Sequence, residues 1–262
     1  MSATAYGDDL LVPSRCRGPA RSGNGGYTAG LLAERLPVAD GSAVEVTLKQ
    51  PPPLDVAMKV QYVDPSDGAR QAVLLMGGAR IAVATVVDDA LDPVGEVSAA
   101  DAKEATTRFA GHESHPFPSC FACGPERPDG DGLRIFPGPV ADDDEATRVA
   151  SSWVPHHSFA DTTHDSPRFD HVPHVGLGIA WAALDCVGGW AGDIGGRRMV
   201  LGRMTALVDT PPVVDEPHVV VGVERGREGR KTFTASTLYD ADGRIVGRAE
   251  HVWISIDPSA FN

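Results

Sequence analysis

The chain has 262 residues, enough for one large domain or two small ones, and its apolar content of 42% is adequate for a sizeable core. A formal net charge of -13 argues against nucleic-acid binding, which depends on clustered Lys and Arg against phosphates. The sequence lacks the long apolar run of a membrane span and the N-terminal pattern of a secretory signal, and its four cysteines are too few for a disulfide scaffold. We therefore expect a cytoplasmic protein with reduced thiols.

The first half of the chain predicts one helix followed by four strands. An apolar segment, residues 27–36, follows a Gly-Gly pair and predicts the helix. Runs of β-favouring residues then predict strands at 44–50, 56–63, 71–76 and 80–87.

The second half repeats this order. Residues 175–191 predict another apolar helix, and strand-like runs follow at 199–208, 218–223, 231–239 and 244–254. The last two runs are separated by Asp-Ala-Asp-Gly, a strong hairpin turn because glycine supplies a positive φ. The chain therefore contains an internal repeat.

Helices that are apolar nearly all round are buried, and strands joined by short turns are antiparallel. The prediction is an α+β fold of two tandem hotdog units, each a curved antiparallel sheet wrapped around a central helix. The first unit is expected over residues 1–110. The second is expected over 111–262, opening with the turn that begins at Cys120.

Three motifs resemble the hotdog-fold acyl-CoA thioesterases. Cys120-Phe-Ala-Cys-Gly124 with Leu133-Arg-Ile-Phe136 resembles the Cys-Phe-x-Cys-Gly…Gly-Leu-x-Leu-x-Phe opening of that family, although Arg127-Pro128 stands where Asn-Pro is usual. Asn24-Gly25-Gly26 resembles its His-Gly-Gly element, and Leu184-Asp185 resembles its Leu-Asp catalytic helix. The resemblance covers roughly residues 10–90 and 117–257.

The resemblance implies one composite active site. In the family a carboxylate lies nine residues after the His of His-Gly-Gly, and it faces the helix N-terminus of the partner unit. The first half has Ala33 at that place, whereas the second half keeps Asp185 but opens with Gly176-Leu-Gly178. Gly25 and Gly26 would therefore polarise a thioester carbonyl, with Asp185 as base or nucleophile. The reciprocal pair, Gly178 with Ala33, lacks the acid.

Asp185 is also the only charge between residues 175 and 191, and a buried carboxylate is costly unless it is paired or hydrogen-bonded. The structural alternatives are an ion pair with an arginine such as Arg203, or exposure to solvent. Asn24 suits a helix N-cap, a role compatible with positioning the donors. Glu34 is either a surface charge or a substitute for the missing acid.

The remaining candidates form the substrate groove. Thr28 is expected in the first helical turn near the thioester. Leu31, Leu32 and Trp181 are expected to line the acyl site between the two helices.

No metal or cofactor is expected. Cys120-x-x-Cys123 suggests zinc or a redox dithiol, but zinc calls for a second ligand pair, and His112 and His115 lie on one short loop before the cysteines. The expected role of the two cysteines is packing in the tight turn that opens the second unit. Residues 155–174 contain five histidines without a known ligand spacing, and they suit an exposed lid better than a metal site.

The leading hypothesis is an acyl-CoA thioesterase-like hydrolase acting on acyl-CoA or another acyl thioester. The first alternative is a non-catalytic hotdog protein that binds acyl-CoA or another apolar ligand, because position 24 is not His. A hydratase is disfavoured, since its Asp…Asn-Pro-x-His signature is absent, and a purely structural assembly would need a closed groove. Sheet edges that need covering make a homo-oligomer possible.

Overall fold

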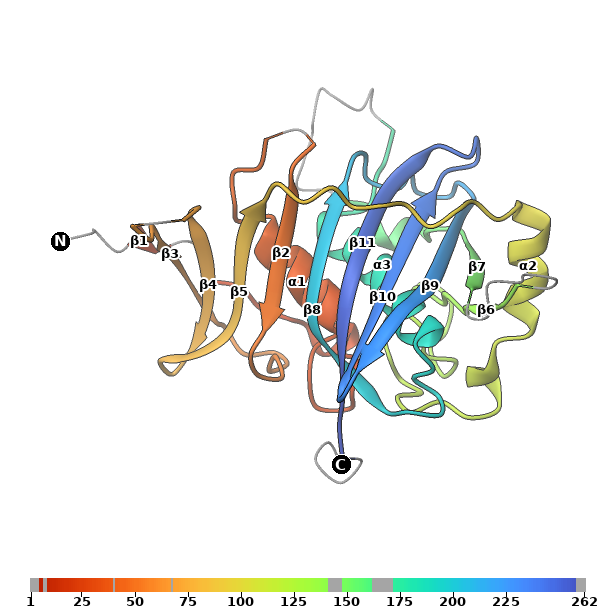
Figure 1. Cartoon of the computed structure of the whole chain (residues 1–262), viewed down its shortest axis with the longest axis horizontal. Coiled ribbons are helices and arrows are strands. Elements are labelled where there is room, and N and C mark those ends of the chain that lie inside the picture. The colour runs from red at the N-terminus through yellow and green to blue at the C-terminus, as the bar shows by residue number, and fades with distance from the viewer. Residues whose placement is uncertain are drawn as a thin grey trace.

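The computed structural model describes residues 5–6, 9–39, 41–66, 68–140, 148–161 and 172–257. Within these residues, eleven antiparallel strands form one sheet in the order β1-β3-β4-β5-β2-β8-β11-β10-β9-β7-β6, shown in Figure 1. The strands are β1 (Ala5–Tyr6), β2 (Ala43–Leu48), β3 (Lys59–Val63), β4 (Gln71–Met76), β5 (Ala79–Val87), β6 (Gly138–Pro139), β7 (Val149–Trp153), β8 (Met199–Val208), β9 (His218–Glu228), β10 (Lys231–Tyr239) and β11 (Ile245–Ser255). The helices are α1 (Gly25–Ala33), α2 (Ala99–Thr107) and α3 (Leu177–Ala191), with short 3-10 turns at Ser14–Cys16, Ala110–His112 and His157–Phe159.

The internal repeat is confirmed by the strand order. β3-β4-β5-β2 in the first half corresponds to β9-β10-β11-β8 in the second. The halves meet where β2 pairs with β8 in antiparallel register, from Val44 opposite Ala206 to Thr47 opposite Arg203. The α+β double hotdog prediction is confirmed by this sheet, which covers α1 and α3 (Figure 1).

Both central helices are buried, as expected from their apolar sequences. α1 and α3 pack against each other and against one face of the sheet. Thirteen of the fifteen residues of α3 are buried. At their crossing, a Cβ on Gly30 would lie 2.8 Å from the Gly178 Cα and 2.9 Å from the Leu177 carbonyl oxygen. Glycine therefore sets how closely the two helices approach.

Most expected strands occur within a few residues of their predicted bounds, but four elements were not predicted: β1, β6, β7 and α2. β7 lies between α2 and α3, and four of its five residues are buried. Because both its faces are covered, it has no alternating pattern to reveal it. α2 has a sequence signal that was missed: the Ser98 hydroxyl accepts a hydrogen bond from the Asp101 N–H at 3.1 Å and caps the helix.

The segment before Ala110 crosses to the second half of the sheet. The Val94 N–H donates to the Thr237 hydroxyl at 2.8 Å, and Ala102 and Ala105 of α2 pack with Val221 of β9. They cover the face of these strands opposite α3. The proposed unit boundary between residues 110 and 111 stays a prediction, but residues 94–107 pack on second-half strands.

Two short strands, β1 and β6, end the sheet, with two residues each. Among the residues that the structure describes, no helix is long and apolar enough to cross a bilayer.

Candidate active site

The N-terminus of α1 is built around Asn24, which is 2% exposed. Its side-chain oxygen accepts a hydrogen bond from the Tyr27 N–H at 2.8 Å, so Asn24 is the predicted N-cap. Its own N–H donates to the Cys16 carbonyl at 2.8 Å. The side-chain amide remains available and points at α3.

Asp185 lies in the middle of α3 and meets this N-terminus. Its Oδ2 accepts hydrogen bonds from the Gly26 N–H at 2.9 Å and from the Asn24 Nδ2 at 3.1 Å. The carboxyl is 2% exposed, and its Oδ1 has no hydrogen-bond partner. The structure therefore brings together Asn24, Gly26 and Asp185, which lie about 160 residues apart in sequence.

The alternative pairing of Asp185 with Arg203 is not observed. Arg203 instead pairs with Glu45 across the β2–β8 junction, with 3.2 Å between the Arg203 Nη1 and the Glu45 Oε2. Asp185 is also not solvent-exposed. In this structure Asp185 is therefore neither ion-paired with Arg203 nor exposed to solvent, and its hydrogen-bond donors are Asn24 and Gly26.

Burial raises the pKa of Asp185 to about 7, and the nearby Cys120 thiol acts in the same direction. The Gly26 N–H and the Asn24 amide oppose this rise, because they stabilise the ionised form. A carboxyl that titrates near neutrality exchanges protons readily, as general acid–base chemistry requires.

Position 26 requires glycine because a side chain there would meet α3. A Cβ there would lie 2.4 Å from the Asp185 Cβ and 2.7 Å from the Trp181 carbonyl oxygen. The missing side chain makes room for α3 and its carboxylate, rather than for a substrate. At Gly25, a Cβ would lie 2.9 Å from Leu201 of β8.

A cavity of about 250 Å³ reaches Asp185. Its wall is mainly apolar and includes residues from α1, α3, β8, β11 and the loop before the Cys-x-x-Cys turn. The lining residues are Gly18, Pro19, Ser22, Gly23, Asn24, Gly25, Leu48, Lys49, Gln50, Pro51, Pro52, His115, Phe117, Cys120, Cys123, Asp185, Cys186, Trp190, Ile194, Met199, Val200, Leu201, Gly202, Trp253 and Ile254.

Within the described part of the chain, none of the four expected groove residues lines this cavity. Leu32 and Trp181 are fully buried in the core, and Leu31 packs against it beside Gly178. The Thr28 hydroxyl donates to the Asn24 carbonyl at 2.8 Å within the helix. These side chains fill the contact between the helices and the sheet, while the cavity opens at the α1 N-terminus.

At the reciprocal position, Ala33 stands where the acid would be and offers no carboxylate. Ala33 is buried, and Gly176 is the N-cap of α3 without a side-chain cap. Gly178 faces Leu31 and Tyr27. Glu34 is an exposed residue at the C-cap of α1, so it does not occupy the place of the missing acid.

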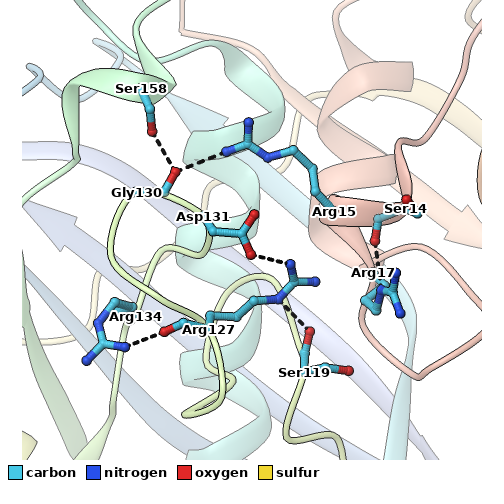
Figure 2. Close-up of polar contacts among 9 residues, drawn as sticks. All are labelled: Ser14, Arg15, Arg17, Ser119, Arg127, Gly130, Asp131, Arg134 and Ser158. Atoms are coloured by element: carbon cyan, nitrogen blue, oxygen red, sulfur yellow. Dashed lines mark hydrogen bonds and ion pairs between the residues drawn. The ribbon is translucent and has the colours of Figure 1, made fainter.

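The loop that contains the Cys-x-x-Cys turn is held by polar contacts, one of which comes from Arg15 in the first half of the chain. Figure 2 shows the Gly130 carbonyl accepting hydrogen bonds from the Arg15 Nη2 at 3.3 Å and the Ser158 hydroxyl at 2.7 Å. The Arg127 guanidinium donates to the Ser119 carbonyl at 2.8 Å and pairs with Asp131 at 2.6 Å. These contacts fix the loop that carries two cavity residues.

Sequence reasoning missed the cavity walls from distant segments, including His115, Phe117, Trp190, Trp253 and Cys186. His115 enters the sequence argument only as a possible zinc ligand. Trp190 lies in a buried apolar helix, and nothing in the sequence indicates that its ring lines a cavity.

The histidine-rich loop is described only in part, because residues 162–171, including His164 and His171, lie outside the described residues. The His174 Nδ1 lies 2.6 Å from the Pro211 carbonyl oxygen. Within its described part, the loop contributes no residue to the cavity. Its role as a lid stays a prediction.

By sequence, no protein-family profile and no curated protein matches the chain. By structure, it is similar to the tesB protein of Mycobacterium avium subsp. paratuberculosis, at a TM-score of 0.58 and 13% identity, over 97% of this chain and 93% of that one. It is similar to a hot dog fold protein of unknown function from Alicyclobacillus acidocaldarius, at 0.59 and 13%, over 98% and 96%. It also resembles acyl-CoA thioesterase II TesB2 of Mycobacterium marinum, at 0.54 and 10%, over 90% and 88%. These likenesses show that the chain has the double hotdog fold.

Proposed function

We propose that this protein is a thioester hydrolase of the acyl-CoA thioesterase type, with one composite site per chain. The observation that carries the proposal is the buried Asp185 carboxylate, hydrogen-bonded to the N-terminus of the opposite helix in the wall of an apolar cavity. The names of two structural neighbours, a tesB protein and acyl-CoA thioesterase II TesB2, support the reaction class.

In this mechanism the acyl group occupies the apolar cavity and its carbonyl carbon lies near Asp185. The unpaired Oδ1 of Asp185 accepts a proton from water as the water oxygen bonds to that carbon. The carbon–sulfur bond then breaks, and the departing thiolate takes the proton. The products are a carboxylic acid and coenzyme A.

The developing oxyanion needs donors. Gly25 is the first residue of α1, so its N–H has no acceptor within the helix. The positive end of the helix dipole adds to this donor. The Gly26 N–H and the Asn24 amide are bonded to Oδ2 in this structure, so they join this donor only if Oδ2 releases them.

One observation favours the non-catalytic alternative, a protein that binds an acyl-CoA or another apolar ligand. The Gly26 N–H, which the family resemblance assigns to the carbonyl, is already bonded to Asp185. If Oδ2 keeps that bond, the cavity accepts an apolar ligand but polarises it weakly.

The decisive experiment measures free-thiol release from short, medium, long and aromatic acyl-CoAs with the wild type, Asp185→Asn and Glu34→Gln. Asp185→Asn is isosteric and retains an acceptor for Gly26, so the fold should persist. We expect its turnover to fall at least about a hundredfold, equivalent to about 2.7 kcal/mol of barrier.

Glu34→Gln is the matched control, because it neutralises an exposed carboxylate directly after Ala33. It should keep wild-type turnover. Equal background rates in all three proteins, together with unchanged ligand affinity in Asp185→Asn, would contradict the hydrolase proposal and support the non-catalytic binding function.

A further inference from the structure

Three cysteines from two separate segments meet in the cavity wall. Cys120 and Cys123 belong to the tight turn before Gly124, and Cys186 lies on α3 directly after Asp185. Their sulfur atoms all lie within 4.8 Å of one another, and those of Cys120 and Cys186 are 3.7 Å apart. All are free thiols and buried.

From this arrangement we propose that Cys120, Cys123 and Cys186 bind a thiophilic divalent cation, zinc(II) being the natural case. Zinc bonds to thiolate sulfur at about 2.3 Å in tetrahedral geometry, which places two ligand sulfurs roughly 3.8 Å apart. The Cys120–Cys186 separation already fits that edge. The Cys-x-x-Cys spacing is also common in zinc sites.

The surroundings suit bound thiolates. The Asn24 side-chain amide lies 3.9 Å from the Cys120 sulfur and 3.8 Å from the Cys186 sulfur, at hydrogen-bonding distance for sulfur. Such a donor orients thiolate ligands and stabilises their charge from the second coordination sphere. The same amide donates to Asp185, so the cation site and the carboxylate share one positioning residue.

The turn is built to hold its two sulfurs in place before any metal arrives. The Gly124 N–H donates to the Cys120 carbonyl at 2.9 Å, and a Cβ on Gly124 would lie 2.5 Å from three backbone atoms. The loop is tied to the first half at Gly130, whose carbonyl accepts a hydrogen bond from the Arg15 Nη2 at 3.3 Å (Figure 2). A site on such fixed elements needs little reorganisation to bind.

The fourth coordination position opens to the cavity, since all three cysteines line it. The His115 imidazole lines it too, but its Nδ1 accepts a hydrogen bond from the Phe117 N–H at 2.9 Å. In that tautomer Nε2 carries the proton, so the imidazole offers no free lone pair. Water or a ligand in the cavity is the fourth donor, as in zinc sites with an open position.

The test measures metal binding and is independent of hydrolysis. Reduced protein is incubated with zinc or with cobalt(II), desalted, and analysed for bound metal and for visible absorption. We expect one metal ion per chain and, with cobalt, thiolate-to-metal charge transfer with the d–d bands of tetrahedral coordination. A thiol assay in denaturant with chelator should find all four cysteines reduced.

Cys123→Ser and Cys186→Ser should each lose most of the bound metal and the charge-transfer band. Cys16→Ser is the matched control, because Cys16 is buried but outside the cluster, and it should bind like the wild type. Circular dichroism identifies any variant that fails to fold, for which Cys186→Ala is the second choice.

The proposal is overturned if wild-type protein with four reduced thiols binds less than about a tenth of an equivalent of either metal. It is equally overturned if folded Cys123→Ser and Cys186→Ser both bind as much as the wild type. Neither result bears on the thiol-release assay, so the hydrolase proposal stands or falls separately.

Discussion

The N-termini of the two central helices occupy equivalent places in the repeat but differ in chemistry. The α1 N-terminus has a side-chain cap at Asn24, and its Gly26 N–H donates to a buried carboxylate. The α3 N-terminus begins after Gly176 without a side-chain cap; Gly178 faces Leu31 and Tyr27, and Asp161 lies near Gly176. The comparison teaches that the fold provides the same two positions for a site, whereas a few polar side chains decide whether a site forms there.

The strands of the two halves also differ in the polarity of their buried side chains. Among the described strand residues of the first half, the buried side chains are apolar. The second half buries a set of polar side chains on its strands: Ser151, Thr205, His218, Thr232, Thr234, Ser236, Thr237 and His251. Hydrogen bonds such as that from the Ser236 hydroxyl to the Leu184 carbonyl, 2.8 Å long, tie these polar strands to α3.

The largest effect should come from adding a methyl group at the helix crossing. In Gly26→Ala the new Cβ meets the backbone oxygen of Trp181, which cannot move aside, so we expect a loss of about 3 kcal/mol of stability or more. In Gly178→Ala it lies 3.1 Å from the end of the flexible Leu31 side chain, so stability should stay within about 1 kcal/mol of wild type. Urea denaturation measures both, and equal losses would contradict the asymmetry.

The next effect tests the polar strands through pH. Burial lowers the pKa of His251 to about 4, below the value of 6.5 in an unfolded chain. Between these values the unfolded state binds the proton more strongly, so the stability is fully present above about pH 6.5 and lost as pH falls towards 4. The loss amounts to about 3 kcal/mol.

The measurement is the free energy of unfolding of the wild type minus that of His251→Gln, at about pH 7.5 and about pH 4.5. Taking the difference cancels the other titrating groups. This difference in the free energy of unfolding should be smaller at the lower pH. A pH-independent difference would show that the pKa of His251 does not change on unfolding.

A smaller effect is expected when α1 is given the cap of α3. Asn24→Gly removes the side-chain acceptor for the Tyr27 N–H and the donor to Asp185. Because glycine is itself a fair cap but leaves a buried carboxylate with one donor fewer, stability should fall by about 1–2 kcal/mol. Asn24→Ser, which keeps a cap acceptor, should recover part of that loss in the same denaturation experiment.

The smallest effect runs the other way. Gly176 has extended backbone angles, φ -69° and ψ 160°, and a Cβ there makes only ordinary contact with Asp161. Gly176→Asn should therefore supply the missing cap and stabilise the protein by a few tenths of a kcal/mol, of the order of the Asn–Gly difference at N-caps. Differential scanning calorimetry can resolve the accompanying rise in Tm, and a fall would mean that the side chain cannot reach the helix.

The sequence predicted the parts of the fold that show one-sided patterns. β4, β8 and β10 have the predicted bounds, because turns delimit them clearly. β7 is covered on both faces, and β1 and β6 are too short to carry a period. α2 was detectable from its Ser98 cap but has no apolar side chain larger than alanine.

For the site, the family resemblance placed Asn24, Gly26 and Asp185 together. It could not locate the cavity, because buried side chains of the two helices, such as Leu32 and Trp181, are equally suited by sequence to line a groove. Cys186 escaped notice as a partner of Cys120, since the pair is 66 residues apart and meets only through the packing of α3.

The antiparallel pairing of β2 with β8 joins in one chain what two identical subunits could form as a symmetric dimer. In such a dimer, every residue near the two-fold axis would be present in both sites, so any substitution would alter both together. A continuous polypeptide removes that constraint. Position 33 can be Ala while its counterpart, position 185, is Asp. Covalent linkage thus lets one site keep its polar groups while its twin supplies only packing.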